Sequence, residues 1–147
     1  MEYYKLIIAT FIITGLWDVM LRFLSLNNDK IPMLLPDFIV NLKPYFQHHT
    51  LLSAALIAGF VGATTQPIIL HLMNFPTKNS NVNYIFKFMI LTFIISALYG
   101  FVMKGSKLFP HLDKHYYEKL GTIRSMYHDG ISGLIVQFTL LFFIMYI

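Results

Sequence analysis

The sequence contains no cysteine, and only 12% of its 147 residues are charged. Without cysteine the chain has no disulfide framework, no thiolate nucleophile and no sulfur ligand for zinc or an iron–sulfur cluster. Soluble domains carry roughly 25% charged residues, so this fraction is too small for an ordinary water-facing surface. A phosphate-binding loop, a dinucleotide fingerprint and a nucleophile elbow are also missing. We therefore expect no cofactor and favour a protein that is not an enzyme.

Hydrophobic residues make up 56% of the sequence. Four apolar runs are long enough to cross a membrane, at residues 6–24, 51–73, 85–103 and 131–147. At 1.5 Å per residue a helix over each run covers about 25–35 Å, which matches a hydrocarbon core. Backbone polar groups must be paired in lipid, so such runs form helices. We predict an all-α integral membrane protein, a four-helix bundle in one domain over 1–147.

The basic residues divide unevenly between the two sides of the predicted bundle. Eight of them lie on the side of the first and third connections: Arg22, Lys30, Lys43, Lys104, Lys107, Lys114, Lys119 and Arg124. Three lie on the opposite side: Lys5, Lys78 and Lys87. Because cytoplasmic loops carry the excess of Lys and Arg, we predict that both termini are non-cytoplasmic. The net charge of +4 fits basic loops of this kind, and we expect no nucleic-acid partner.

The first and third spans resemble each other at an offset of 82 residues, which pairs Trp17 with Tyr99. The second and fourth spans align near an offset of 79. We predict a tandem duplication of a two-helix hairpin, with units 1–73 and 83–147. Two such units would be related by an axis along the membrane normal, as in other parallel repeats. Chance similarity between apolar helices is the alternative interpretation.

Asp18 and Arg22 lie one helical turn apart in the first span, so their side chains share a face. A carboxylate well inside a span costs about 2.5–3.5 kcal/mol on insertion scales, and we expect this one to be paired within the bundle. The alternative is a proton or ion relay. In the repeat alignment Arg22 has a basic counterpart, Lys104, whereas Asp18 corresponds to Gly100.

Two glutamines and a set of small residues complete the intramembrane candidates. Gln66 and Gln137 either satisfy backbone groups, such as the carbonyl that Pro67 leaves without a donor, or line a polar path. Small residues at four-residue spacing let helices approach closely. The residues predicted to pack helices together, within the chain or between copies, are Gly15, Ala55, Gly59, Gly62, Ala63, Ser96 and Gly100.

Most histidines fall on the predicted cytoplasmic side, and four of them are metal-ligand candidates: His49, His111, His115 and His128. His111 and His115 have the helical spacing that can bind one metal ion. The complete histidine boxes of membrane di-iron hydroxylases are absent. Solvated interfacial histidines that titrate near neutral pH are therefore the default interpretation.

Residues 111–127 show apolar positions at steps of three and four, with charged residues on the other face. This pattern predicts an amphipathic helix in the membrane interface, before the last span. Its basic residues favour contact with anionic lipid headgroups.

Three hypotheses for the function follow. The first is a multi-pass protein with a structural or membrane-organising role in assembly, whose partners are the lipid bilayer, further copies of itself or other membrane proteins. Its abundant Ile, Phe, Asn and Lys are typical of an AT-rich genome, such as that of a large DNA virus. The second is a small ion or proton channel or transporter that uses Asp18 and Arg22. The third is a membrane metalloenzyme built on the cytoplasmic histidines.

Overall fold

A computed structural model describes residues 2–27, 50–106, 108, 117–118 and 120–146. Its described part is helical, with no strand, and its elements in chain order are α1 (Tyr3–Leu26), α4 (Leu51–Leu72), α5 (Val82–Gly100), the π-helical turn η1 (Phe101–Gly105) and α7 (Thr122–Tyr146). Because η1 continues α5, four helices are long and apolar enough to cross a membrane. The prediction of four spanning helices is confirmed.

Local sequence explains where these helices begin. Thr50 and Asn81 precede α4 and α5, and their side chains accept hydrogen bonds from the amides of Ser53 (3.1 Å) and Tyr84 (2.8 Å). Such caps satisfy amide groups that have no partner within the helix. Gly121 precedes α7 with a φ of +78°, a left-handed conformation that glycine adopts without steric cost.

The fourth span differs from its prediction, because α7 begins at Thr122 and not near Ile131. Asp129 therefore lies two turns inside the helix. The helix reaches further back because Gly121 supplies its start: the Gly121 carbonyl accepts from the amide (3.1 Å) and hydroxyl (2.9 Å) of Ser125. Residues 111–116 and 119 of the predicted amphipathic helix lie outside the described residues, and the part from Thr122 to Tyr127 is the beginning of α7.

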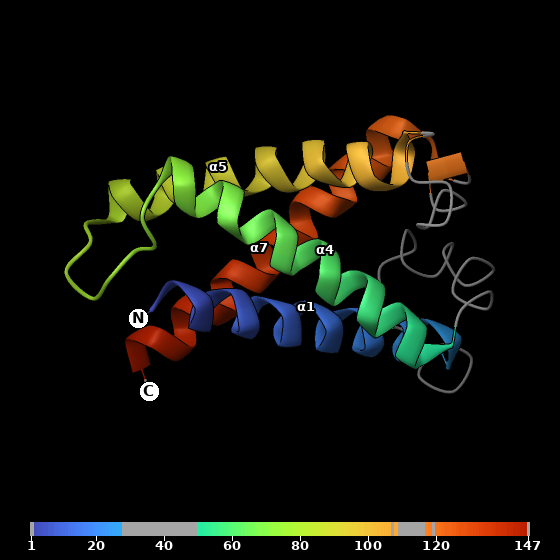
Figure 1. Cartoon of the computed structure of the whole chain (residues 1–147), viewed down its shortest axis with the longest axis horizontal. Coiled ribbons are helices and arrows are strands. Elements are labelled where there is room, and N and C mark those ends of the chain that lie inside the picture. Colours follow the sequence, from blue (N-terminus) through green and yellow to red (C-terminus); the bar gives the residue numbers. More distant parts are fainter. Residues whose placement is uncertain (1, 28–49, 107, 109–116, 119, 147) are drawn as a thin grey trace.

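The helices form two antiparallel hairpins, α1 with α4 and α5 with α7. The contacts within each hairpin are more extensive than those between α1 and α7 or between α4 and α5. The bundle is thus a ring in the order α1, α4, α5, α7, with α4 and α7 on a diagonal; these two helices cross in the view of Figure 1. Both chain termini lie at the same end of the bundle as the connection between α4 and α5 (Figure 1).

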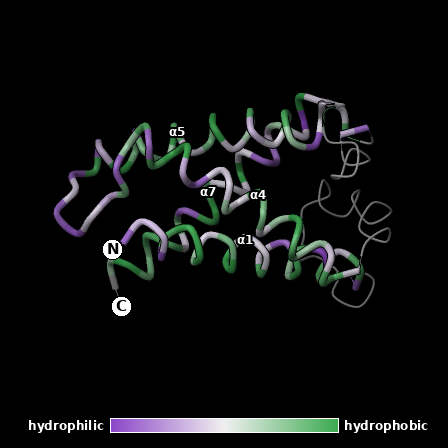
Figure 2. Tube along the Cα trace, in the orientation of Figure 1, coloured by the Kyte–Doolittle hydropathy of each residue, from purple (hydrophilic) through white to green (hydrophobic). Residues whose placement is uncertain are grey.

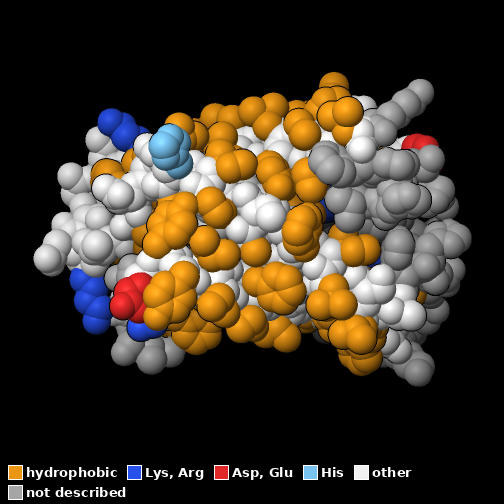
Figure 3. Space-filling model, viewed as in Figure 1, with side chains coloured by type: hydrophobic (Ala, Val, Ile, Leu, Met, Phe, Trp, Pro, Cys, Tyr) orange, Lys and Arg blue, Asp and Glu red, His pale blue; other side chains and the backbone are white. Residues whose placement is uncertain are grey.

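The outer surface of the bundle is apolar. Large hydrophobic side chains are exposed along every helix, for example Leu16, Phe60, Leu98 and Phe138, and they cover the face seen in Figure 3. Hydrophilic residues gather in the connection between α4 and α5 (Figure 2). A lateral surface of this kind suits lipid and not water, so the structure is that of a multi-pass membrane protein.

Small residues bring the helices of each hairpin together, as their spacing predicts. In the first hairpin Gly15 lies against the backbone of Ala55, Gly59 against Phe11, and Gly62 against Thr14. Glycines also lie at the helix contacts of the second hairpin. In it Gly130 lies against Phe93, Gly133 against Ser96, and Gly100 against Asp129. These packing faces are used within one chain; Ala63 is half-buried on α4.

Replacing Gly15 by alanine should loosen the first hairpin. The added Cβ would lie 2.9 Å from the Ala55 carbonyl oxygen, so α1 and α4 must move apart. Overpacking of this kind costs about 1–3 kcal/mol, and we expect a lower midpoint of thermal unfolding in detergent. Leu16→Ala, on the lipid-facing side of the same helix, is the control, and an equal loss in both variants would contradict the assigned interface.

Candidate functional site

A cavity of about 210 Å³, lined by polar and apolar residues, lies between the two hairpins. One water needs roughly 10–15 Å³ on this measure, so the cavity has room for several waters or a small solute. All four helices contribute to its lining. Its polar lining residues are Thr10, Thr14, Trp17, Asp18, Arg22, Thr65, Gln66, Ser96, Lys104, His128, Asp129, Ser132 and Gln137. The structure therefore brings the four predicted intramembrane polar residues to one site.

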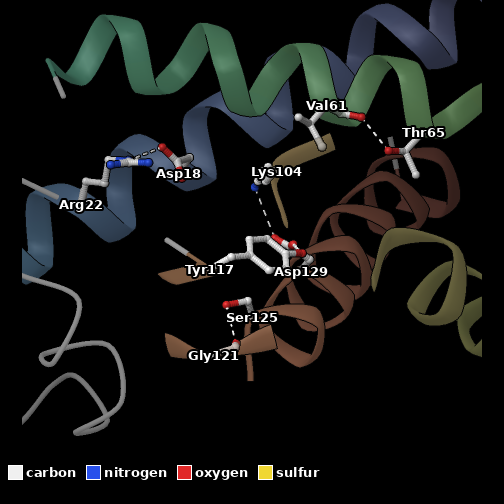
Figure 4. Close-up of polar contacts among 9 residues, drawn as sticks. All are labelled: Asp18, Arg22, Val61, Thr65, Lys104, Tyr117, Gly121, Ser125 and Asp129. Carbon is white, nitrogen blue, oxygen red and sulfur yellow. Dashed lines mark hydrogen bonds and ion pairs between the residues drawn. The ribbon is translucent and has the colours of Figure 1, made fainter. Parts of the chain in front are cut away.

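The first hairpin contributes an ion pair to this cavity. Arg22 Nε donates to Asp18 Oδ2 at 2.5 Å, along one face of α1, as the spacing predicts (Figure 4). The Arg22 side chain is 3% exposed and that of Asp18 is 26% exposed. Burying a guanidinium costs free energy unless the group is paired, so the Asp18 carboxylate offsets the cost of burying Arg22.

The second hairpin contributes a second ion pair that sequence reasoning missed. Lys104 Nζ, on η1, donates to Asp129 Oδ1 at 3.3 Å, and the Tyr117 hydroxyl donates to Asp129 Oδ2 at 2.5 Å (Figure 4). Asp129 fits against Gly100, where a larger residue would clash with its carboxylate. In the sequence Gly100 lies one turn before Lys104 and leaves room for an acid, but it does not indicate which helix supplies that acid.

Tyr117 lies before α7, and its phenol stays protonated beside Asp129. Burial raises the pKa of Tyr117 far above its ordinary value, and the nearby negative charge of Asp129 and the hydrogen bond to it raise it further. The neutral phenol is therefore a permanent donor to Asp129.

The two glutamines meet across the diagonal of the bundle. Gln137 Nε2 on α7 donates to Gln66 Oε1 on α4. Both side chains are almost fully buried, at 1% exposed for Gln66 and 2% for Gln137. Gln66 Nε2 and Gln137 Oε1 make no hydrogen bond within the described protein. A buried polar atom without a partner costs about 1–3 kcal/mol, so this unmet donor and acceptor are expensive features of the cavity wall.

The threonine hydroxyls of the wall are satisfied locally. Thr10 donates to the carbonyl of Leu6 (2.7 Å), Thr14 to that of Thr10 (2.7 Å), and Thr65 to that of Val61 (2.6 Å; Figure 4). Such back-bonding to the preceding turn is usual for threonine in helices. The threonines of the wall therefore differ from the glutamine pair, whose amides retain an open donor and acceptor.

Toward the end that holds the termini, the helices carry buried apolar residues. Leu6, Ile69 and Leu140 are 4%, 1% and 2% exposed there. A second hollow of about 540 Å³ lies beyond them, lined in part by Leu6 and Leu70. The first cavity reaches Thr10 and Ile69, so one helical turn on α1 separates the two hollows, whereas on α4 their lining residues are adjacent in the chain.

The structure assembles no metal site among the residues it describes. His128 lines the cavity beside Asp129. His49, His111 and His115 lie outside the described residues, so the predicted pairing of His111 with His115 stays a prediction.

No protein family, characterised protein or solved structure that was compared with the chain matches it.

The raised pKa of Tyr117 predicts a pH dependence of stability. The neutral phenol stabilises the fold below the ordinary tyrosine pKa of 10.0, and this contribution is lost as the pH rises above that value. Tyr117→Phe removes both the hydrogen bond and the ionisable group. We expect the parent to have the higher unfolding midpoint at neutral pH and to lose that advantage above about pH 10. Thermal unfolding in detergent measures both; Tyr127→Phe, at an exposed tyrosine, should show no such crossover.

Proposed function

We propose that this protein is a small membrane transporter or channel, whose solute path is the cavity between the two hairpins. The observation that carries this proposal is the cavity itself, which holds an acid–base pair from each hairpin and two buried glutamines. This is the second hypothesis drawn from the sequence, and Asp129 and Lys104 now join Asp18 and Arg22.

The cost of these groups supports a path rather than a purely structural bundle. Each intramembrane charge is expensive even when it is paired, and such residues mark solute or proton pathways in many membrane proteins. Helix packing in this chain is already supplied by its small residues, such as Gly15 and Gly59. A cavity lined by charged groups adds nothing to that packing, because a void removes van der Waals contacts.

The positions of the two hollows suggest how access is controlled. The cavity extends to Asp18 and Arg22 on α1, and in the other direction it ends at Thr10 and Ile69. The second hollow begins at Leu6 and Leu70. A movement of one hairpin against the other would join or separate the two hollows at these apolar residues. The less extensive contacts between the hairpins favour movement at that interface.

The membrane-organising role gains less support. The small-residue faces that would join copies are used inside one chain, and Lys114 and Lys119 of the basic interfacial segment lie outside the described residues. Contact with anionic lipid headgroups and self-association therefore stay predictions. A metalloenzyme stays a third hypothesis, with His128 as its one described ligand candidate at the cavity.

Filling the cavity should block transport. Ala58 lines it on α4, whereas Ala63 on the same helix does not. We expect Ala58→Leu to slow solute or ion flux into proteoliposomes about tenfold, equivalent to about 1.4 kcal/mol on the barrier. Ala63→Leu, the matched control, should leave the flux close to that of the parent. A parent protein that passes neither ions nor small neutral solutes above protein-free vesicles would refute the proposed function.

We also propose that the two hairpins are copies of one unit. The contacts support an offset of 82 between α1 and α5, because Phe11 meets Gly59 as Phe93 meets Gly130. They favour an offset of 71 between α4 and α7, in place of the offset of 79 predicted from sequence. At 71 the pattern Gly-x-x-Gly-x-x-x-Gln of 59–66 matches that of 130–137.

With these two offsets, the acids lie on non-equivalent helices: one is on the first helix of its hairpin and the other is on the second. Asp18 on α1 corresponds to Gly100, and Asp129 on α7 corresponds to Ala58. Each acid pairs with the basic residue at the common position, Arg22 in one hairpin and Lys104 in the other. The second hairpin thus keeps an acid–base pair and supplies the acid from its other helix.

This equivalence predicts that the acid of the first hairpin can be moved by mutation from α1 to α4. Asp18→Gly alone leaves Arg22 without this carboxylate, which should cost about 1–3 kcal/mol of stability. Adding Ala58→Asp recreates the arrangement of the second hairpin and should restore most of the unfolding midpoint. A double variant no more stable than Asp18→Gly alone would contradict the proposed register.

A further inference from the structure

The glutamine pair has the features of a binding site for a small solute. Gln137 donates to Gln66, which leaves Gln66 Nε2 as a donor and Gln137 Oε1 as an acceptor, both without a partner in the described protein. The two residues are almost completely buried, and both line the cavity. An open donor and an open acceptor in adjacent amides complement a group that both accepts and donates hydrogen bonds. Hydroxyl and carboxamide groups do this, whereas a bare ion does not.

The charges of the cavity point to a neutral occupant. Its formally charged lining residues are Asp18 and Asp129, which are matched by Arg22 and Lys104. The acids and bases form ion pairs with each other at 2.5 Å and 3.3 Å. The formal charge of the lining is therefore zero. An ion that enters would lose its hydration without gaining an uncompensated opposite charge, which is strongly unfavourable.

The size of the cavity sets an upper limit on the occupant. Its volume of about 210 Å³ exceeds the space of one water more than tenfold. A polyol or amide of a few heavy atoms fits, together with waters at the charged end. The satisfied threonine hydroxyls along the wall offer acceptor oxygens for such a solute on its way to the amides.

We propose that Gln66 and Gln137 bind a small neutral solute that carries hydroxyl or carboxamide groups. This inference rests on the proposed function, because it takes the cavity as the solute path and names the class of solute. The free amide of Gln66 donates to the oxygen of the solute, and the free oxygen of Gln137 accepts from its O–H or N–H. The pair thus joins the two hairpins through a solute as well as through its own hydrogen bond.

Permeability of proteoliposomes to glycerol and to urea tests this assignment. Each solute is measured by stopped-flow light scattering, beside fluxes of protons, potassium and chloride through the same preparation. The test variant is Gln66→Met with Gln137→Met, which keeps the length of both side chains and removes both amides. We expect it to lower glycerol or urea permeability about tenfold, the effect of losing hydrogen bonds to the solute.

The matched control is Thr92→Val. The Thr92 hydroxyl is also buried and without a partner in the described protein, but it does not line the cavity. Its removal should leave permeability unchanged. Where the double methionine variant does not fold, Gln66→Glu replaces it, since this change keeps the oxygen that accepts from Gln137 and removes the free donor.

The outcomes separate this inference from the proposed function. Ion flux without permeability to glycerol or urea would overturn the neutral-solute site and leave the transporter standing. Permeability that the glutamine variants do not reduce would also overturn the site. The absence of every flux would refute both. Permeability to at least one neutral solute, lost with the amides and kept in Thr92→Val, is the result we expect.

Discussion

The requirement that polar groups inside a membrane be paired within the protein governs this structure. Four helices satisfy their own backbones, and an apolar lateral surface faces outward. The charged side chains that remain inside are then arranged as acid–base pairs, Asp18 with Arg22 and Asp129 with Lys104. Removing one member of either pair would leave a buried charge, which is why these four residues depend on one another.

Close helix packing occurs within each hairpin, whereas the polar side chains lie between the hairpins. Within each hairpin, glycines such as Gly59 and Gly130 bring the helices into contact with an aromatic ring on the facing helix. Between the hairpins the contacts are less extensive, and the cavity occupies that space. The division leaves each hairpin well packed, while the interface between the hairpins is held by polar contacts such as that of Gln66 with Gln137. Trp17 adds one more, to Thr139 at 3.0 Å.

The proposed path depends on features of the cavity that helix packing does not require. The charged residues of its lining balance, and the two buried glutamines keep an amide donor and an amide acceptor without a partner in the described protein. In the proposed function these amides are the recognition point, and the buried apolar residues Leu6, Ile69 and Leu140 are the barrier. Both hairpins contribute residues to the cavity, to the amide pair and to the apolar barrier. A movement of one hairpin against the other would therefore change all three together.

The sequence by itself determined the four spans and the pairing of Asp18 with Arg22, because both depend on local properties: apolar length and the spacing of one helical turn. The role of Asp129 was decided only by the tertiary structure. Its partners Lys104 and Tyr117 come from other segments, and no local pattern encodes a contact between residues so far apart in the chain. The same holds for Gln66 and Gln137. Each glutamine is recognisable as an intramembrane polar residue, but only the crossing of α4 and α7 makes the two amides a single site.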